Sequence, residues 1–139
     1  MTTSPLKQKV QIVAIAKDQL LLLQFTEDRG CGYQNITGSV EFGENFTEAA
    51  VRELAEETGI KSNVIDIHFT FNFHDRWGSD VEEKIFLYYQ TKKPEISLSP
   101  EHQSFKWVPV ADVTVKDFSF PTNYEAFLLA LKYVQENLK

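Results

Sequence analysis

Apolar residues fall into several short stretches of the chain, and in residues 64–73 apolar and polar positions alternate. Alternation with a period of two predicts β-strands, because successive side chains of a strand point to opposite faces. Polar residues and glycine separate the stretches, as at residues 17–19 and 26–32. The predicted strands and extended segments are residues 10–16, 20–25, 33–40, 64–73, 82–92 and 105–110. We expect 82–92 to be the antiparallel partner of 64–73.

The first predicted strand is apolar on both faces. Its even-numbered positions from Val10 to Ala16 are apolar, and Val13 and Ile15 make the opposite face apolar as well. A strand of this kind is typical of the centre of a sheet, where both faces are covered.

Two segments have the period of an α-helix. The first covers about 45–58, with Asn45 as a candidate N-cap and Glu48 as its capping-box partner. Gly59 is placed to adopt the left-handed conformation that ends a helix. The second covers 121–138. Strands interrupted and followed by helices predict an α/β fold, in which helices cover a mixed sheet.

Length and composition narrow the function. The 139 residues fit one domain, 1–139, and the net charge of −6 argues against binding to nucleic-acid backbones. No apolar run approaches the roughly 20 residues that a membrane span needs. The N-terminus lacks the pattern of a signal peptide, and the single cysteine, Cys31, excludes an intrachain disulfide. We therefore expect a cytoplasmic protein, either a monomer or a homodimer, with no nucleic-acid or membrane partner.

The most informative residues are acidic. At about 100° per residue, the side chains of Glu53, Glu56 and Glu57 project within an arc of roughly 100° on one helix face. Glu44 lies just upstream, and Arg52 is the only basic residue beside them. Such a cluster is either a solvated helix face or a site for hard divalent cations that bridge to a phosphate chain. The imbalance of charge favours the metal site.

The same segment resembles the signature of the Nudix hydrolases, Gly-x5-Glu-x7-Arg-Glu-U-x-Glu-Glu-x-Gly-U, where U is aliphatic. All nine constrained positions match: Gly38, Glu44, Arg52, Glu53, Leu54, Glu56, Glu57, Gly59 and Ile60. The resemblance implies an α/β/α sandwich around a central mixed sheet. It also implies hydrolysis of a nucleoside diphosphate linked to another group, with Mg²⁺ or Mn²⁺ as cofactor.

The resemblance also implies roles for the acids. Glu53 and Glu57 would be the main metal ligands, with Glu56 sharing the work. Glu44 would ligate through water, and the carbonyl of Gly38 would add a backbone oxygen. The metals would neutralise phosphate oxygens and activate an attacking water.

The base that accepts the proton of this water comes from the helix or from a later loop. Glu101 is the loop candidate, both as base and as metal ligand. The alternative interpretation is that Glu101 is only a surface acid beside a proline. Arg52 is expected to pair with Glu56 or to orient a neighbouring acid. Cys31 is interpreted as a loop residue. The three histidines have no zinc spacing, so oxygen ligands and Mg²⁺ or Mn²⁺ are favoured.

Two further segments narrow the resemblance. The run Thr-Gly-Ser-Val-Glu at 37–41 and the Glu-His-x3-Lys-Trp pattern at 101–107 resemble the family branch that hydrolyses dihydroneopterin triphosphate and dATP. That branch implies Thr37 and Ser119 as substrate contacts. Lys7 is a separate candidate for a contact with the phosphate chain. The implied substrate is a nucleoside or pterin triphosphate. Residues 71–80 and Phe25 depart from that branch.

Aromatic residues offer a surface for a flat ring. Phe71, Phe73 and Trp77 could stack on a base or a pterin. For Phe71 and Phe73 the favoured interpretation is core packing, whereas Trp77 is an equally good candidate for substrate binding. Tyr88 and Tyr89 are interpreted as strand packing.

Three other functions remain open. One is cleavage of a dinucleoside polyphosphate or a nucleotide sugar. The second is a catalytically silent nucleotide sensor, against which the intact acids argue. The third, a structural adaptor, is supported only by the acidic surface.

Overall fold

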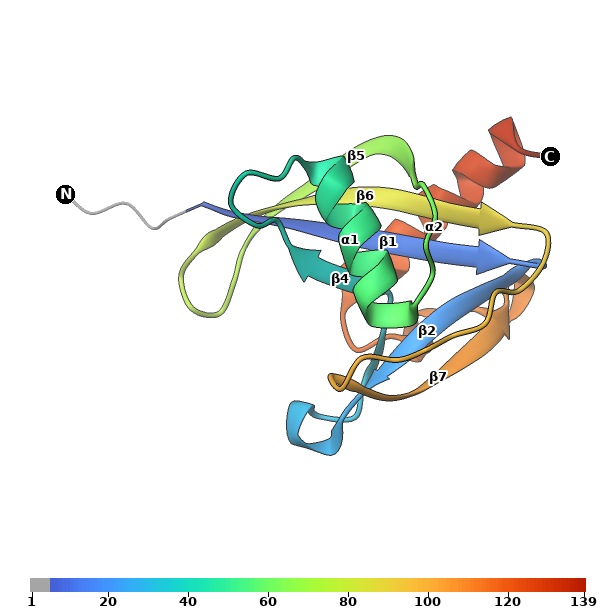
Figure 1. Ribbon diagram of the computed structural model, residues 1–139, viewed down its shortest axis with the longest axis horizontal. Coiled ribbons are helices and arrows are strands. Elements are labelled where there is room, and N and C mark those ends of the chain that lie inside the picture. Colours follow the sequence, from blue (N-terminus) through green and yellow to red (C-terminus); the bar gives the residue numbers. More distant parts are fainter. Residues whose placement is uncertain (1–5) are drawn as a thin grey trace.

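The structure is a computed structural model that describes residues 6–139, so the first five residues of the predicted domain lie outside it. The described residues form a seven-stranded sheet and two α-helices (Figure 1). The strands are β1 Lys7–Ala16, β2 Gln19–Phe25, β3 Tyr33–Gln34, β4 Ile36–Ser39, β5 Ile65–His74, β6 Asp80–Gln90 and β7 His102–Pro109. The helices are α1 Phe46–Thr58 and α2 Pro121–Asn137, and short 3-10 turns cover Glu27–Arg29, Val110–Asp112 and Val115–Asp117.

The sheet is mixed, as predicted. Its main path is β3-β2-β1-β6-β5, with β4 beside β1 and β7 beside β2. β1 and β6 are parallel and run together from Lys7 opposite Val81 to Ala16 opposite Gln90. The other pairings are antiparallel, including the predicted pairing of β5 with β6. β1 therefore lies in the middle of the sheet, as its two apolar faces predicted.

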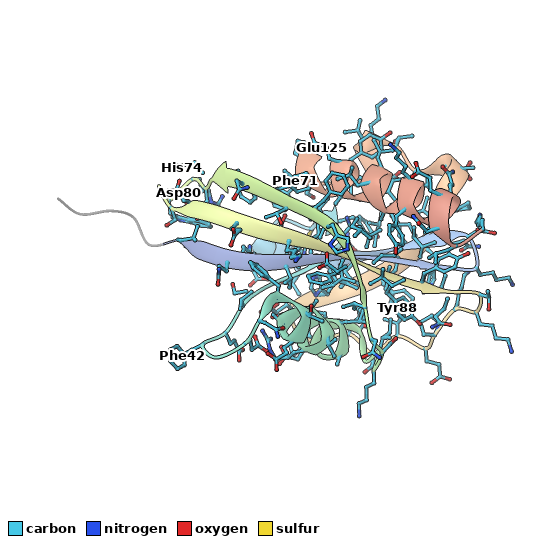
Figure 2. The ribbon with its side chains drawn as sticks, turned by 90° about the horizontal axis from the view of Figure 1, so that it is seen from above. Phe42, Phe71, His74, Asp80, Tyr88 and Glu125 are labelled. Carbon is cyan, nitrogen blue, oxygen red and sulfur yellow. The ribbon has the colours of Figure 1, made fainter. Side chains whose placement is uncertain are left out.

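The two helices cover opposite faces of the sheet (Figures 1 and 2). On one face Leu54 of α1 packs with Ile12 and Phe86, and on the other Phe127 of α2 packs with Val13 and Ile85. The α/β/α sandwich is confirmed. Neither helix of residues 6–139 is long and apolar enough to pass through a bilayer.

Local signals place α1 accurately. The Asn45 side chain accepts a hydrogen bond from the Glu48 N–H at 2.8 Å, and Glu48 accepts one from the Asn45 N–H at 3.0 Å. Gly59 ends the helix with φ of 77°. The capping box and the terminating glycine are both as predicted, so the register of the acidic face is fixed at both ends.

Two expectations need correction. The extended segment predicted at 33–40 is divided into β3 and β4 at Asn35, because the Asn35 N–H donates to the Asn123 side chain and not to a strand. Phe73 is not a core residue, since it is 37% exposed on β5. Phe71 does pack in the core beneath α2, on the side of Glu125 (Figure 2), and Tyr88 is buried on the α1 side, as expected.

Candidate functional site

A cleft of about 1140 Å³ joins the acidic face of α1 to the α2 side of the sheet. Its lining includes the carboxylates of Glu53, Glu56 and Glu57, together with Glu101 from the segment before β7. The remaining wall comes from β1, β2, β3, β4, the β5–β6 hairpin and the residues around the start of α2. It includes Lys7, Lys9, Phe25, Gln34, Thr37, Phe73, Trp77, Glu83, Phe120 and Asn123.

Gly38 allows Glu53 to lie against the sheet. A Cβ at residue 38 would be 2.0 Å from the carboxyl carbon of Glu53 and 2.3 Å from its Oε1. No side chain fits in that space unless Glu53 moves away. The glycine in β4 is therefore part of the architecture that holds the Glu53 carboxylate at the cleft.

Arg52 connects three of the acids. It makes a two-pronged contact with Glu44, with Nε to Oε2 at 2.7 Å and Nη2 to Oε1 at 2.9 Å. Its Nη1 donates to Glu53 at 2.8 Å and to Glu56 at 3.0 Å, and Nη2 also donates to the Ser39 carbonyl at 2.8 Å. The predicted pairing with Glu56 is present. Arg52 thus orients the acids and ties α1 to β4.

Glu57 has different partners. His102 Nδ1 lies 2.8 Å from Glu57 Oε2, although it is not aligned as a linear hydrogen bond, and both residues are buried. The Ser99 hydroxyl donates to the same oxygen at 2.9 Å. Gln34 Nε2 lies 3.3 Å from His102 Nε2, which favours the tautomer that carries its proton on Nδ1, facing Glu57. The loop before β7 therefore positions this carboxylate from the opposite side.

The environment separates the pKa values of the acids. Burial raises the pKa of Glu53 above its usual value, against the opposing effect of Arg52. Burial also acts to raise the pKa of Glu57, but the adjacent His102 ring, the Ser99 hydroxyl and Glu101 outweigh it and lower the pKa overall. Arg52 lowers the pKa of Glu44 through its hydrogen bonds. These acids are therefore held in different protonation environments within one site.

The donor set suits a hard cation. The carboxylates that line the cleft are oxygen ligands, which Mg²⁺ and Mn²⁺ prefer. The side chains of residues 6–139 do not gather three acidic, histidine or cysteine groups at coordination distance. Arg52 occupies Glu53 and Glu56, so a cation has to compete with the guanidinium for these oxygens. The residues fit such a cation in the chemistry of their oxygen donors.

The predicted site residues fall into two groups. Gly38, Glu53, Glu56, Glu57, Glu101, Thr37, Lys7 and Trp77 all line the cleft. Glu44, Arg52 and Ser119 are outside its lining. Both oxygens of Glu44 bind Arg52. Ser119 packs against Gly32, where an added Cβ would be 1.6 Å from the Oγ of Ser119.

Residues at the tip of the β5–β6 hairpin contact each other and Lys7 at the start of β1. Lys7 Nζ forms an ion pair with Asp75 at 2.8 Å and lies 5.1 Å from the centre of the Trp77 ring. The Arg76 guanidinium lies 4.4 Å from the same ring, which is well exposed. Two cations and an aromatic face thus gather beside the cleft at the tip of the β5–β6 hairpin.

Sequence reasoning missed several residues of the cleft. Gln34, Glu83, His102 and Asn123 are buried polar residues that line it. Each sits in a strand or helix where periodicity marks it only as polar. The available signal was for His102 alone, which belongs to the Glu-His-x3-Lys-Trp pattern at 101–107, but that pattern assigned it no role at the site.

A family model described as NUDIX domain matches residues 5–130. The chain belongs to the Nudix hydrolase family. The match extends from before β1 into α2, so it includes the acidic helix and the whole cleft. The chain therefore belongs to a family whose members hydrolyse phosphoric anhydrides with divalent metal ions.

Individual relatives of this Nudix chain differ in their activities. An octanoyltransferase of Myxococcus xanthus is 34% identical over 66% of the chain, but the chain spans only 27% of that protein. The asymmetrical bis(5'-nucleosyl)-tetraphosphatase of Caenorhabditis elegans is 30% identical over 66% of the chain and 72% of its own length. The solved structure of the E. coli dihydroneopterin triphosphate pyrophosphohydrolase is 25% identical, with a TM-score of 0.78 over 90% of this chain and 95% of that one.

Proposed function

We propose that this Nudix hydrolase is a pyrophosphohydrolase that converts a nucleoside triphosphate or dihydroneopterin triphosphate to the monophosphate and pyrophosphate. The observation that carries the proposal is that one cleft is lined both by the acids of α1 with Glu101 and by polar and aromatic side chains. A substrate with a triphosphate chain and a flat ring suits both parts of this lining, because the acids would hold the phosphates through metal ions and the aromatic side chains would contact the ring. The similarity to the E. coli pyrophosphohydrolase supports this class of substrate.

Glu53, Glu56 and Glu57 are the proposed ligands of Mg²⁺ or Mn²⁺, with Glu101 completing the set from the loop. The metal supplies charge neutralisation and a more acidic bound water. Glu101 and Glu57 are close enough to share a hydrogen bond, and two such carboxyl groups repel each other when both are ionised. A cation between them relieves that repulsion. Gly38 and Arg52 fix the position of Glu53 on the other side.

Glu53 and Glu101 are the proposed general bases, because each lines the cleft close to the metal ligands. Burial favours the protonated form of Glu53, so a bound cation has to offset that effect before Glu53 can act as an anion. Lys7 and Thr37 are proposed to contact the phosphate chain, and Trp77 the ring. The net charge of −6 and the single cysteine support small-molecule substrates and a cytoplasmic setting.

The test is a panel of triphosphates, including dATP and dihydroneopterin triphosphate, with Mg²⁺ and identification of the products. We expect pyrophosphate and a monophosphate, and at least about a 100-fold loss of turnover in Glu53→Gln. Glu136→Gln is a matched control, because Glu136 is exposed on α2 and its nearest partner is Lys132 at 3.8 Å. Wild-type turnover by Glu53→Gln would falsify the assignment.

The second candidate is asymmetric cleavage of a dinucleoside polyphosphate, which the C. elegans relative favours. Product analysis separates the two functions, since this reaction yields two nucleotides and no pyrophosphate. Tight nucleotide binding without turnover of any substrate would instead indicate a nucleotide sensor.

A further inference from the structure

Glu83 on β6 is a buried acid in the wall of the cleft, far along the chain from the metal-binding helix. It is 4% exposed, and its neighbours in the same wall include Gln34 and Asn123, which are 5% and 3% exposed. Among the described residues, its side chain accepts one hydrogen bond, from Gln11 Nε2 at 2.9 Å, and forms no ion pair within 4.0 Å. A buried carboxylate is costly unless its oxygens receive further donors.

A chain of amides fixes the orientation of Gln11. Its Oε1 accepts a hydrogen bond from Asn35 Nδ2 at 2.8 Å, which leaves its Nε2 directed to Glu83. Asn35 is held in turn by Asn123 of α2, whose side chain accepts from the Asn35 N–H at 2.8 Å and whose carbonyl accepts from Asn35 Nδ2 at 3.0 Å. The network spans β1, the junction between β3 and β4, β6 and α2. It presents the Glu83 carboxyl group at the cleft in one orientation.

A carboxylate has about four acceptor positions on its two oxygens, and Gln11 uses one. Because Glu83 lines the cleft, a ligand there can supply the missing donors. Lys9 lies beside Glu83 on β1 and favours the charged form, whereas burial raises the pKa of Glu83. Two N–H donors from a ligand would compensate the carboxylate in the way that bidentate pairing does.

Two classes of flat ring carry this donor pair. The edge that guanine (2-amino-6-oxo) and pterins (2-amino-4-oxo) share has a ring N–H beside an exocyclic amine. Adenine offers one donor and one acceptor at the corresponding edge. Aromatic side chains suited to the faces of such a ring line the same cleft, with Phe73 37% and Phe120 48% exposed.

We propose that Glu83 determines substrate specificity by binding the paired N–H donors of a ring with a 2-amino group beside a ring N–H, as found in guanine and in pterins. The inference rests on the proposed triphosphate hydrolysis and names the ring that the cleft selects. Gln11, Asn35 and Asn123 are positioning residues that hold the Glu83 carboxyl group toward that ring.

The test compares kcat/KM for GTP, ITP and ATP, because ITP differs from GTP only in lacking the 2-amino group. We expect the wild type to prefer GTP over ITP by about 10- to 100-fold, the range for one hydrogen bond to a charged group. In Glu83→Gln the preference should disappear, because the amide places its own N–H₂ against the donors. Glu82→Gln is the matched control, since Glu82 is on the opposite sheet face and accepts from Gln8 at 3.2 Å. It should keep the preference.

The second part of the test measures kcat/KM for dihydroneopterin triphosphate. Its turnover should depend on Glu83 as that of GTP does, and the larger kcat/KM of the two identifies the source of the ring. A wild type that does not distinguish GTP from ITP overturns the inference, and this comparison does not depend on how any variant folds. A Glu83→Gln enzyme that retains the preference overturns it as well.

Binding of GMP and IMP to the metal-free protein separates this inference from the proposed function. If no triphosphate is hydrolysed, the proposed function fails, yet a Glu83-dependent preference for GMP would still support the ring selection. If triphosphates are hydrolysed but GMP and IMP bind equally well, the proposed function is supported and the role of Glu83 in ring selection is refuted.

Discussion

Replacement of Gly38 by alanine should disable the enzyme while leaving the fold nearly intact. The new Cβ would lie 2.0 Å from Glu53 Cδ and 2.3 Å from Cγ. Since ordinary carbon contacts are about 3.5 Å or longer, the carboxyl group has to retreat by about 1.5 Å. A displacement of about 1 Å at a reacting centre can cost about 100-fold in rate, so we expect kcat to fall by at least about that factor.

The expected loss of stability is moderate. Gly38 does not have the positive φ that excludes other residues, and the displaced Glu53 loses one ion pair with Arg52 at 2.8 Å. Arg52 keeps its contacts with Glu44 and Glu56, so the forced repacking should cost about 1 to 3 kcal/mol of unfolding free energy. Urea denaturation followed by circular dichroism should therefore still give one cooperative transition at a moderately lower midpoint, and steady-state hydrolysis with Mg²⁺ should give the loss in kcat.

Gly30→Ala provides the opposite control. Gly30 has φ of 100°, and a Cβ added there would have no heavy atom within 4 Å, so its replacement causes backbone strain without contact at the acids. We expect a loss of about 1 to 2 kcal/mol in unfolding free energy and no change in kcat. Turnover at the wild-type rate by Gly38→Ala would refute the steric reasoning about Glu53.

Three further predictions concern stability in the metal-free protein. His102→Phe keeps an aromatic ring but removes the donor that lowers the pKa of Glu57. The stability that this donor contributes is present above the usual pKa of 4.5 and is lost as the pH falls below it, so the variant should be less stable than wild type at pH 7 and approach it near pH 4. The control His74→Phe, at an exposed histidine, should show no such trend. Glu83→Gln should gain stability relative to wild type as the pH rises from 5 to 8. The reason is that the pKa of Glu83 is raised in the folded state, so the wild type loses stability as this group ionises. An equal difference between the urea midpoints of variant and wild type at the two pH values would contradict this. Asn45→Ala should lose about 1 kcal/mol of unfolding free energy, and an unchanged urea midpoint would mean that the cap is not needed.

Local signals made much of the fold predictable. The register of α1 follows from Asn45, Glu48 and Gly59, because capping involves residues only a few positions apart. The grouping of Glu53, Glu56 and Glu57 then follows from helix geometry alone, and all three do line one cleft. Strand alternation likewise identified β5 and β6 as partners.

The substrate end of the cleft could not be predicted in the same way. Glu83 meets Gln11 because β1 and β6 are parallel neighbours, a pairing between segments about 70 residues apart that leaves no mark on local periodicity. His102 meets Glu57 through the packing of the β7 loop on α1. Phe73 looks like a core residue in an alternating strand, and only the edge position of β5 explains its exposure.

The most direct test of the central claim is calorimetric titration of Mg²⁺ and Mn²⁺ into the protein with a non-hydrolysable triphosphate analogue. We predict uptake by the wild type and by Glu136→Gln, and at least about tenfold weaker uptake by Glu53→Gln and Glu57→Gln. Absence of uptake by the wild type, or equal uptake by all four proteins, would contradict the assignment of these glutamates to a metal site.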